Sequence, residues 1–193
     1  MPPLDPLPLA VDLMAIDSTS GREGEVIAWM HGLLEQRGWR VQRIPVTPGR
    51  DDVLATSDEA PLVTLSTHLD TVPPYMPPRI AGDRLLGRGA CDAKGIAAAM
   101  ICAAEQLRGQ GVPVALLFVV GEEVTHDGAH AANAAPTTSR ILIDGEPTES
   151  TLALGTKGAV RAVVRTSGRA AHSAYPELGR SATRELVHLL REL

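Results

Sequence analysis

The distribution of apolar residues along the chain predicts alternating helices and strands. Helices are predicted, most of them from apolar residues at helical spacing, over 5–16, 22–37, 94–107, 126–133 and 180–193. Strands are predicted from β-branched or continuously apolar runs at 39–46, 53–55, 61–68, 112–120, 140–143 and 158–167, with a turn over 48–52 and a hairpin over 80–87. Strands that alternate with helices are typical of an α/β fold, so we expect a three-layer α/β/α sandwich with a mostly parallel sheet.

The pattern changes near Gly155. Beyond this residue the chain offers one strand with a polar face, a loop that contains a histidine, and one helix. One strand and one helix cannot bury a core of their own. We therefore expect one domain over residues 1–156 and the beginning of an α+β domain, cut short, over residues 157–193.

Composition and charge exclude several classes of function. The 193 residues carry 18 Lys and Arg against 23 Asp and Glu, without a basic run, and only 3% are aromatic. These features argue against binding to nucleic acid or to an anionic membrane. No apolar run approaches the roughly 20 residues that span a bilayer, and the N-terminus lacks the features of a secretory signal. Cys91 and Cys102 provide no disulfide framework, so the expected location is the cytoplasm.

Acidic and histidine side chains follow three of the predicted buried strands. His68 ends one strand, Glu122 and Glu123 follow another, and Asp144 and Glu146 follow a third. Ligands bind at the carboxyl ends of strands in an open α/β sheet. Several carboxylates on one edge would repel one another unless a cation compensates them. Histidine and carboxylates without thiolates suit one or two zinc ions, with cobalt or manganese as alternatives.

Each of these groups also has a simpler explanation. A lone His68 is more often a hydrogen-bonded core residue than a ligand, although Asp70, two residues on, could orient its ring. Asp92 could cap the helix that begins near Lys94. The two adjacent glutamates could be a solvated loop pair. The order in which all of them recur favours a metal site.

Short motifs, in this order along the chain, resemble the successive signatures of the M20 metallopeptidase family: THLDTVP (67–73), GRGACDAKG (87–95), GEE (121–123), GEPT (145–148), GTKG (155–158) and AHSAYP (171–176) with Gly179. The family comprises acetylornithine deacetylases, succinyl-diaminopimelate desuccinylases, aminoacylases and carboxypeptidases. The resemblance extends over essentially the whole chain and implies the zinc-peptidase fold with two zinc ions in each active site.

The resemblance implies a set of metal ligands. His68 and Glu146 would bind the first zinc, Glu123 the second, and Asp92 would bridge the two. Asp144 is a competing candidate, but GEPT is the better match to the family and favours Glu146. Family members supply one more histidine from a later part of the chain, which this sequence does not contain.

The resemblance also implies catalytic roles. Asp70 would support the histidine ligand, and Glu122 would be the general base that takes a proton from the metal-bridging water and later gives it to the leaving amine. His172 would lie in a lid domain, reach the active site of the partner subunit in a homodimer, and stabilise the oxyanion. The alternative for His172 is a loop histidine packed beside Tyr175.

The activity implied is that of a zinc-dependent amidohydrolase. The motifs resemble the amino-acid-biosynthesis branch, so the expected substrate is a small N-acylated amino acid and the enzyme would be similar to an acetylornithine or acetyl-lysine deacetylase. The alternatives are a dipeptidase or carboxypeptidase, and a non-catalytic binding or dimerisation module. Because the sequence stops at Leu193, inside the expected lid, we expect a fragment of a longer enzyme whose second zinc site is incomplete.

Overall fold

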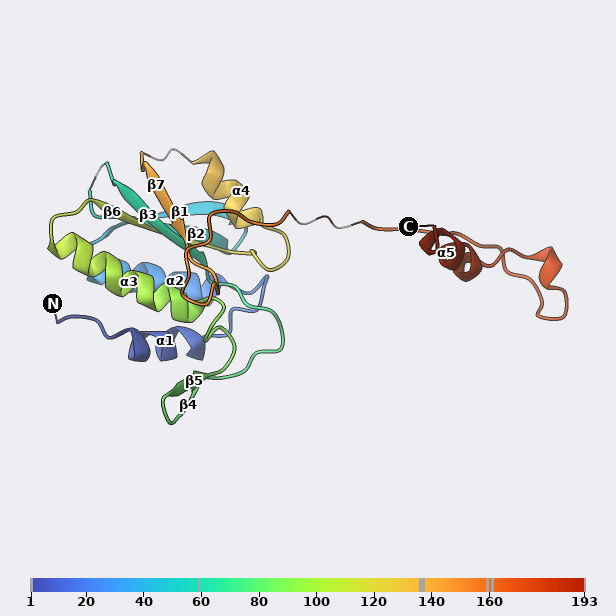
Figure 1. The fold of residues 1–193 in the computed structure, drawn as a ribbon, viewed down its shortest axis with the longest axis horizontal. Helices are drawn as coiled ribbons and strands as arrows, with labels where there is room; N and C mark the ends of the chain where they lie inside the picture. Colours follow the sequence, from blue (N-terminus) through green and yellow to red (C-terminus); the bar gives the residue numbers. More distant parts are fainter. Residues whose placement is uncertain (1, 59, 136–137, 159, 161, 193) are drawn as a thin grey trace. The chain divides into compact units, whose positions relative to one another are not determined.

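The chain forms two compact units in a computed structural model, which describes residues 2–58, 60–135, 138–158, 160 and 162–192. The division between the units falls between Thr151 and Leu152. The first unit contains a central sheet with helices on both of its faces, and the second contains a short helix and extended chain (Figure 1). Within the described residues, no helix has the length and apolar character needed to cross a lipid bilayer.

A five-stranded mixed sheet with the order β1-β2-β6-β3-β7 forms the centre of the first unit (Figure 1). Its strands are β1 (Arg40–Thr47), β2 (Arg50–Thr56), β3 (Val63–His68), β6 (Val114–Val119) and β7 (Ile141–Asp144). Strand β3 pairs in parallel with β6 and β7, whereas β2 is antiparallel to both of its neighbours. Only β2 therefore runs against the other strands of this described sheet, and the expected α/β fold with a mostly parallel sheet is confirmed.

The helices cover both faces of the sheet (Figure 1). Helices α2 (Gly24–Gln36) and α3 (Lys94–Gly109) pack on one face, and α1 (Pro6–Ala15) packs against α3. Helix α4 (Asp127–Ala134) packs on the other face, against β1, β2 and β6. A small hairpin of β4 (Arg79–Ala81) and β5 (Arg84–Leu86) follows β3. This arrangement is the expected three-layer sandwich.

Strand β3 shows how sequence alternation places the side chains. All of its residues are buried, as expected for a central strand. Val63 and Leu65 belong to the core beneath α2 and α3, whereas Ser66 and His68 line a cavity together with residues of α4. The period of two thus directs the last side chain of the strand to the α4 side of the sheet.

The turn expected over 48–52 is shorter in the structure, and this prediction is wrong in its extent. The chain reverses at Pro48 and Gly49, where Gly49 has a φ of +79°, and β2 begins already at Arg50. Asp52 is consequently a fully buried strand residue, whose Oδ1 accepts the N–H of Val120 at 3.0 Å. Charged residues in this strand are tolerated because they find partners in neighbouring elements.

Arg50 joins three elements through a largely buried ion-pair network. Its Nε donates to Oε2 of Glu23 at 2.8 Å and its Nη1 donates to Oδ2 of Asp127 at 2.8 Å. The Glu23 side chain, just before α2, is fully buried, and Asp127 begins α4. The network fixes the loop between β6 and α4, because Asp127 lies at the end of that loop.

The second unit, residues 152–192, differs from the expectation. No strand forms over the described residues of 158–167, and residues 159 and 161 lie outside the described part of the chain. An isolated bridge joins Arg169 to Arg180 instead. A strand needs a neighbour to share its hydrogen bonds, and the described residues of this unit offer none. The expected helix is confirmed as α5 (Ala182–Leu190), which Ser181 caps by accepting the Arg184 N–H at 3.2 Å.

Replacing Arg50 with methionine is expected to lower the free energy of unfolding by about 3–5 kcal/mol, because the buried Glu23 would lose its countercharge. The matched control is Arg43→Met in the same hairpin. The Arg43 pair with Asp51 is 3.5 Å long and partly exposed, so its loss should cost no more than about 1 kcal/mol. Urea denaturation measures both variants, and equal effects would contradict a structural role for the network.

Replacing Asp52 with asparagine is expected to stabilise the chain increasingly as the pH rises. Burial raises the pKa of Asp52 to about 7, and its Oδ2 is buried without a hydrogen-bond partner among the described residues. A carboxyl with a raised pKa favours folding while it is protonated, and this contribution is lost between about pH 4 and pH 7. The difference in unfolding free energy between Asp52→Asn and wild type should therefore grow from pH 5 to pH 8. A constant difference would show that Asp52 keeps its ordinary pKa.

Candidate metal centre

His68 stands at the end of β3 with both ring nitrogens in contact with oxygen atoms. The side chain is 1% exposed. Nδ1 lies 2.9 Å from the backbone oxygen of Asp70, and Nε2 lies 2.8 Å from Oδ1 of Asp92. A histidine whose Nδ1 donates to a backbone carbonyl presents Nε2 to a ligand, which is the usual arrangement at a metal site.

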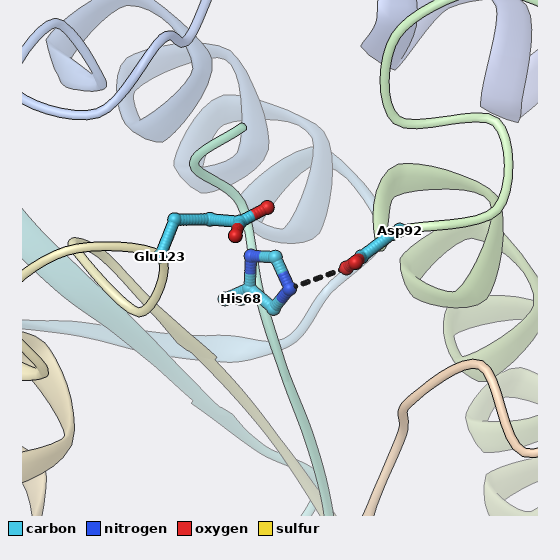
Figure 2. Close-up of side chains that lie close together, drawn as sticks. All are labelled: His68, Asp92 and Glu123. Atoms are coloured by element: carbon cyan, nitrogen blue, oxygen red, sulfur yellow. Dashed lines mark hydrogen bonds and ion pairs between the residues drawn. The ribbon is translucent and has the colours of Figure 1, made fainter. Parts of the chain in front are cut away.

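Three potential ligands converge at this point: His68, Asp92 and Glu123. Their ligand atoms all lie within 4.8 Å of one another. In Figure 2 the His68 ring lies between the two carboxylates, with Asp92 coming from the loop before α3 and Glu123 from the loop after β6. They meet because β3 and β6 are parallel neighbours with His68 in register with Val119, so the segments that follow both strands reach one edge of the sheet.

Glu146 adjoins this group from the other side of β3. It follows β7, which is also parallel to β3, and its Oε1 lies 3.9 Å from Nε2 of His68. It does not belong to the set in which every ligand atom is within 4.8 Å of the others. Asp144, the competing candidate, is the last residue of β7 and is exposed.

The charges around His68 fit a bound cation. Burial opposes protonation of this ring, but Asp70, Glu146 and other carboxylates outweigh it and raise the pKa of His68 to about 10. Burial raises the pKa of Glu146 to about 7. The charge of His68 lowers this pKa, whereas Asp92 and further carboxylates raise it. Without a metal, the protonated His68 ring supplies the positive charge that these carboxylates require. A divalent ion would take over this role, and the ring would release its proton when the ion binds. A donor set of imidazole nitrogen and carboxylate oxygen suits zinc and similar ions.

Asp70 connects the ring to the loop that carries the two glutamates. It is fully buried; its Oδ1 accepts the N–H of Glu122 at 2.9 Å and its Oδ2 accepts the N–H of Glu123 at 3.2 Å. Its Oδ1 also lies 3.5 Å from Nδ1 of His68. Burial alone would raise the pKa of Asp70, but the hydrogen bonds from His68, Ser20 and Glu122 lower it below the ordinary value. The carboxylate is therefore charged, and it orients His68 and the loop together.

The side chain of Glu122 is not one of the three clustered ligands. Its Oε1 is 3.6 Å from Nδ1 of His126. It lines a cavity of about 590 Å³ to which His68 and Glu146 also contribute. The adjacent glutamates thus have different surroundings, since only Glu123 joins the ligand group.

His172 belongs to the second unit. Its Nδ1 accepts the N–H of Ala174 at 3.1 Å, and its ring centre lies 6.2 Å from that of Tyr175. The side chain is exposed.

The segment Ser18–Gly21 lies between the helices predicted over 5–16 and 22–37, and its sequence did not indicate a role at the site. Ser18 Oγ donates to the backbone oxygen of Leu69 at 2.6 Å, and Ser20 Oγ donates to Oδ2 of Asp70 at 2.7 Å. The run of hydroxyl residues was the available signal. Its partners could not be identified without the fold, because they lie about fifty positions further along the chain.

Comparison with known proteins gives the family. The model of peptidase family M20/M25/M40 matches residues 64–181. A probable carboxypeptidase of Aspergillus clavatus is 39% identical over 94% of this chain and 45% of its own length. A peptidase M20 domain-containing protein of Schizosaccharomyces pombe is 40% identical over 91% of this chain and 46% of its own.

Solved structures with low sequence identity share the fold. A tripeptidase from Staphylococcus aureus is 19% identical with a TM-score of 0.70, over 97% of this chain and 56% of that one. A dinuclear metal binding peptidase of the M20 family from Bacillus subtilis is 17% identical with a TM-score of 0.51, over 68% and 40%. The chain spans about half the length of the curated relatives it matches. Because the family model covers more than half of its residues, this chain belongs to peptidase family M20/M25/M40.

Proposed function

We propose that this chain provides the metal-binding part of a peptidase that hydrolyses short peptides, of the carboxypeptidase or dipeptidase type. The convergence of His68, Asp92 and Glu123 carries this proposal. Relatives named as probable carboxypeptidases and a structural neighbour named as a tripeptidase support the choice of peptides as substrates.

The proposed cofactor is a pair of zinc ions, with cobalt or manganese as alternatives. His68 and Glu146 would hold one ion and Glu123 the other, with Asp92 between them. When bound, such ions lower the pKa of water, polarise the substrate carbonyl and stabilise negative charge on its oxygen. Asp70 keeps the ring of His68 oriented for this purpose.

Glu122 is the proposed general base. Its backbone N–H is fixed by Asp70, while its carboxylate stays outside the group of clustered ligands. A base must be close to the attacking water without being bound as a ligand, so that its oxygen remains free to accept a proton. Glu122 would take that proton and then pass it to the nitrogen of the departing amine.

His172 is proposed as an oxyanion donor that acts across a homodimer. Its Nδ1 accepts a backbone N–H, so a neutral ring must carry its hydrogen on Nε2. Nε2 is thus a donor suited to a developing oxyanion. The second unit would then act as the lid and dimerisation domain.

The same centre would also suit a second substrate class, small N-acylated amino acids. Removal of an N-acetyl group and cleavage of a peptide both break an amide bond. The motifs at 87–95 and 145–148, which resemble those of deacetylases, support this candidate.

A cytoplasmic location is also proposed, because Cys91 and Cys102 are both unpaired, as is usual in a reducing compartment.

Replacing Glu122 with glutamine is expected to lower kcat by about 10²–10⁴-fold, because the base is lost, while the metal content stays unchanged. The assay compares dipeptides, longer peptides with a free C-terminus, and N-acetyl amino acids. The matched control is Glu123→Gln, which should lose metal as well as activity. Unchanged hydrolysis by Glu122→Gln would refute the proposed mechanism, and a wild-type chain that binds metal without hydrolysing any substrate would favour the non-catalytic alternative.

Replacing Glu146 with glutamine is expected to reduce the metal bound per chain, whereas Asp144→Asn should leave it unchanged. Of these two carboxylates, Glu146 is the one with a described contact to the His68 ring, at 3.9 Å from Nε2. Elemental mass spectrometry after dialysis against zinc and then metal-free buffer measures the stoichiometry, with His68→Ala as the reference for a lost ligand. If Asp144→Asn loses metal and Glu146→Gln does not, Asp144 is the ligand in place of Glu146.

A further inference from the structure

We infer that Ser20 is a positioning residue of the metal centre, acting through Asp70 on the loop that carries Glu122 and Glu123. This inference rests on the proposed function, since it assigns Ser20 a part in holding the same ligands. The residue lies outside the matched region of the family model, 64–181.

The backbone around Ser20 is fixed independently of its hydroxyl group. The N–H of Thr71 donates to the oxygen of Ser18 at 3.1 Å, and the N–H of Ser20 donates to the oxygen of Thr71 at 3.1 Å. Ser18 Oγ adds the bond to the oxygen of Leu69 at 2.6 Å. Removing the Ser20 hydroxyl leaves all of these bonds in place, so its effect can be separated from that of unfolding the segment.

The hydroxyl completes the set of donors around Asp70. Ser20 Oγ donates to Oδ2 at 2.7 Å, the same oxygen that accepts the N–H of Glu123 at 3.2 Å. The other oxygen, Oδ1, accepts the N–H of Glu122 at 2.9 Å. Donors on both oxygens fix the rotation of a carboxylate about its Cβ–Cγ bond, so each oxygen stays opposite one backbone N–H.

The orientation of Asp70 sets the spacing of the ligands. Two consecutive N–H groups of the loop donate to this carboxylate, and Nδ1 of His68 lies 3.5 Å from its Oδ1. Without the Ser20 hydroxyl, Oδ2 would keep, among the described residues, only the longer hydrogen bond from the N–H of Glu123, at 3.2 Å. The carboxylate could then turn, and Glu123 would shift relative to His68 and Asp92.

The test compares Ser20→Ala with Thr19→Val. The Thr19 hydroxyl lies on the same segment but donates to Oδ1 of Asp17 at 2.7 Å, so its loss controls for the removal of a hydroxyl group near the site. Co²⁺ is titrated into the metal-free full chain, followed by visible absorption and calorimetry. In Ser20→Ala the Co²⁺ ion held by Glu123 should bind about 10–100-fold more weakly, with an altered absorption spectrum. Thr19→Val should behave as wild type.

Two further measurements distinguish positioning from a structural role. The thermal midpoint of metal-free Ser20→Ala should match that of Thr19→Val, and with saturating Co²⁺ its kcat for a peptide should fall while KM stays constant. Equal Co²⁺ affinity and spectra in wild type and Ser20→Ala would overturn the inference and leave the proposed function intact. So would a loss of thermal stability in Ser20→Ala that accounts for its weaker binding. A wild-type chain that binds no Co²⁺ would instead overturn the proposed function itself.

Discussion

The geometry of the site depends on the hydrogen bonds that the fully buried carboxylate of Asp70 accepts. A charged group without access to water is tolerated only where several donors face it. Here the donors come from the loop after β6 and from the segment before α2. The need to satisfy one buried charge therefore brings together segments that are distant along the chain and gives them a common reference point beside His68.

A second charged network holds the opposite end of the same loop. Arg50 binds Glu23 and Asp127, so the residues between Val120 and Asp127 are fixed at both ends. The glutamates lie in the part that Asp70 holds, and the cavity borders Glu122. The loop can thus present two adjacent carboxylates to different surroundings, which a mobile loop could not maintain.

The regular parts of the fold could be predicted from the sequence pattern. A buried strand such as β3 and a helix packed on the sheet such as α3 consist largely of small, apolar or β-branched residues, and this composition indicates burial. The start of β2 could not, since Arg50 and Asp52 look like turn residues until their partners in other elements are known. The strand expected over 158–167 failed for a related reason. Its alternation satisfied the local pattern, but the described residues of that unit provide no neighbour for it.

The convergence of His68, Asp92 and Glu123 followed from the rule that ligands gather at strand ends, together with the family motifs. The contribution of Ser20 could not be predicted, because a hydroxyl group in a loop gives no indication of its acceptor. Ion pairs such as those of Arg50 with Glu23 and Asp127 could not be predicted from the sequence either. Sequence patterns report what a residue is buried against on average, whereas these contacts depend on single partners fixed by the tertiary structure.

The parallel pairing of β3 with β6 has a consequence for the order of folding. Parallel neighbours need a long crossover, and here the connection includes the β4–β5 hairpin and α3. The potential ligands become neighbours only after that crossover has closed, so an unfolded chain has no preformed site to offer. A metal ion would therefore bind the folded chain and not the unfolded one, and would stabilise the fold by mass action.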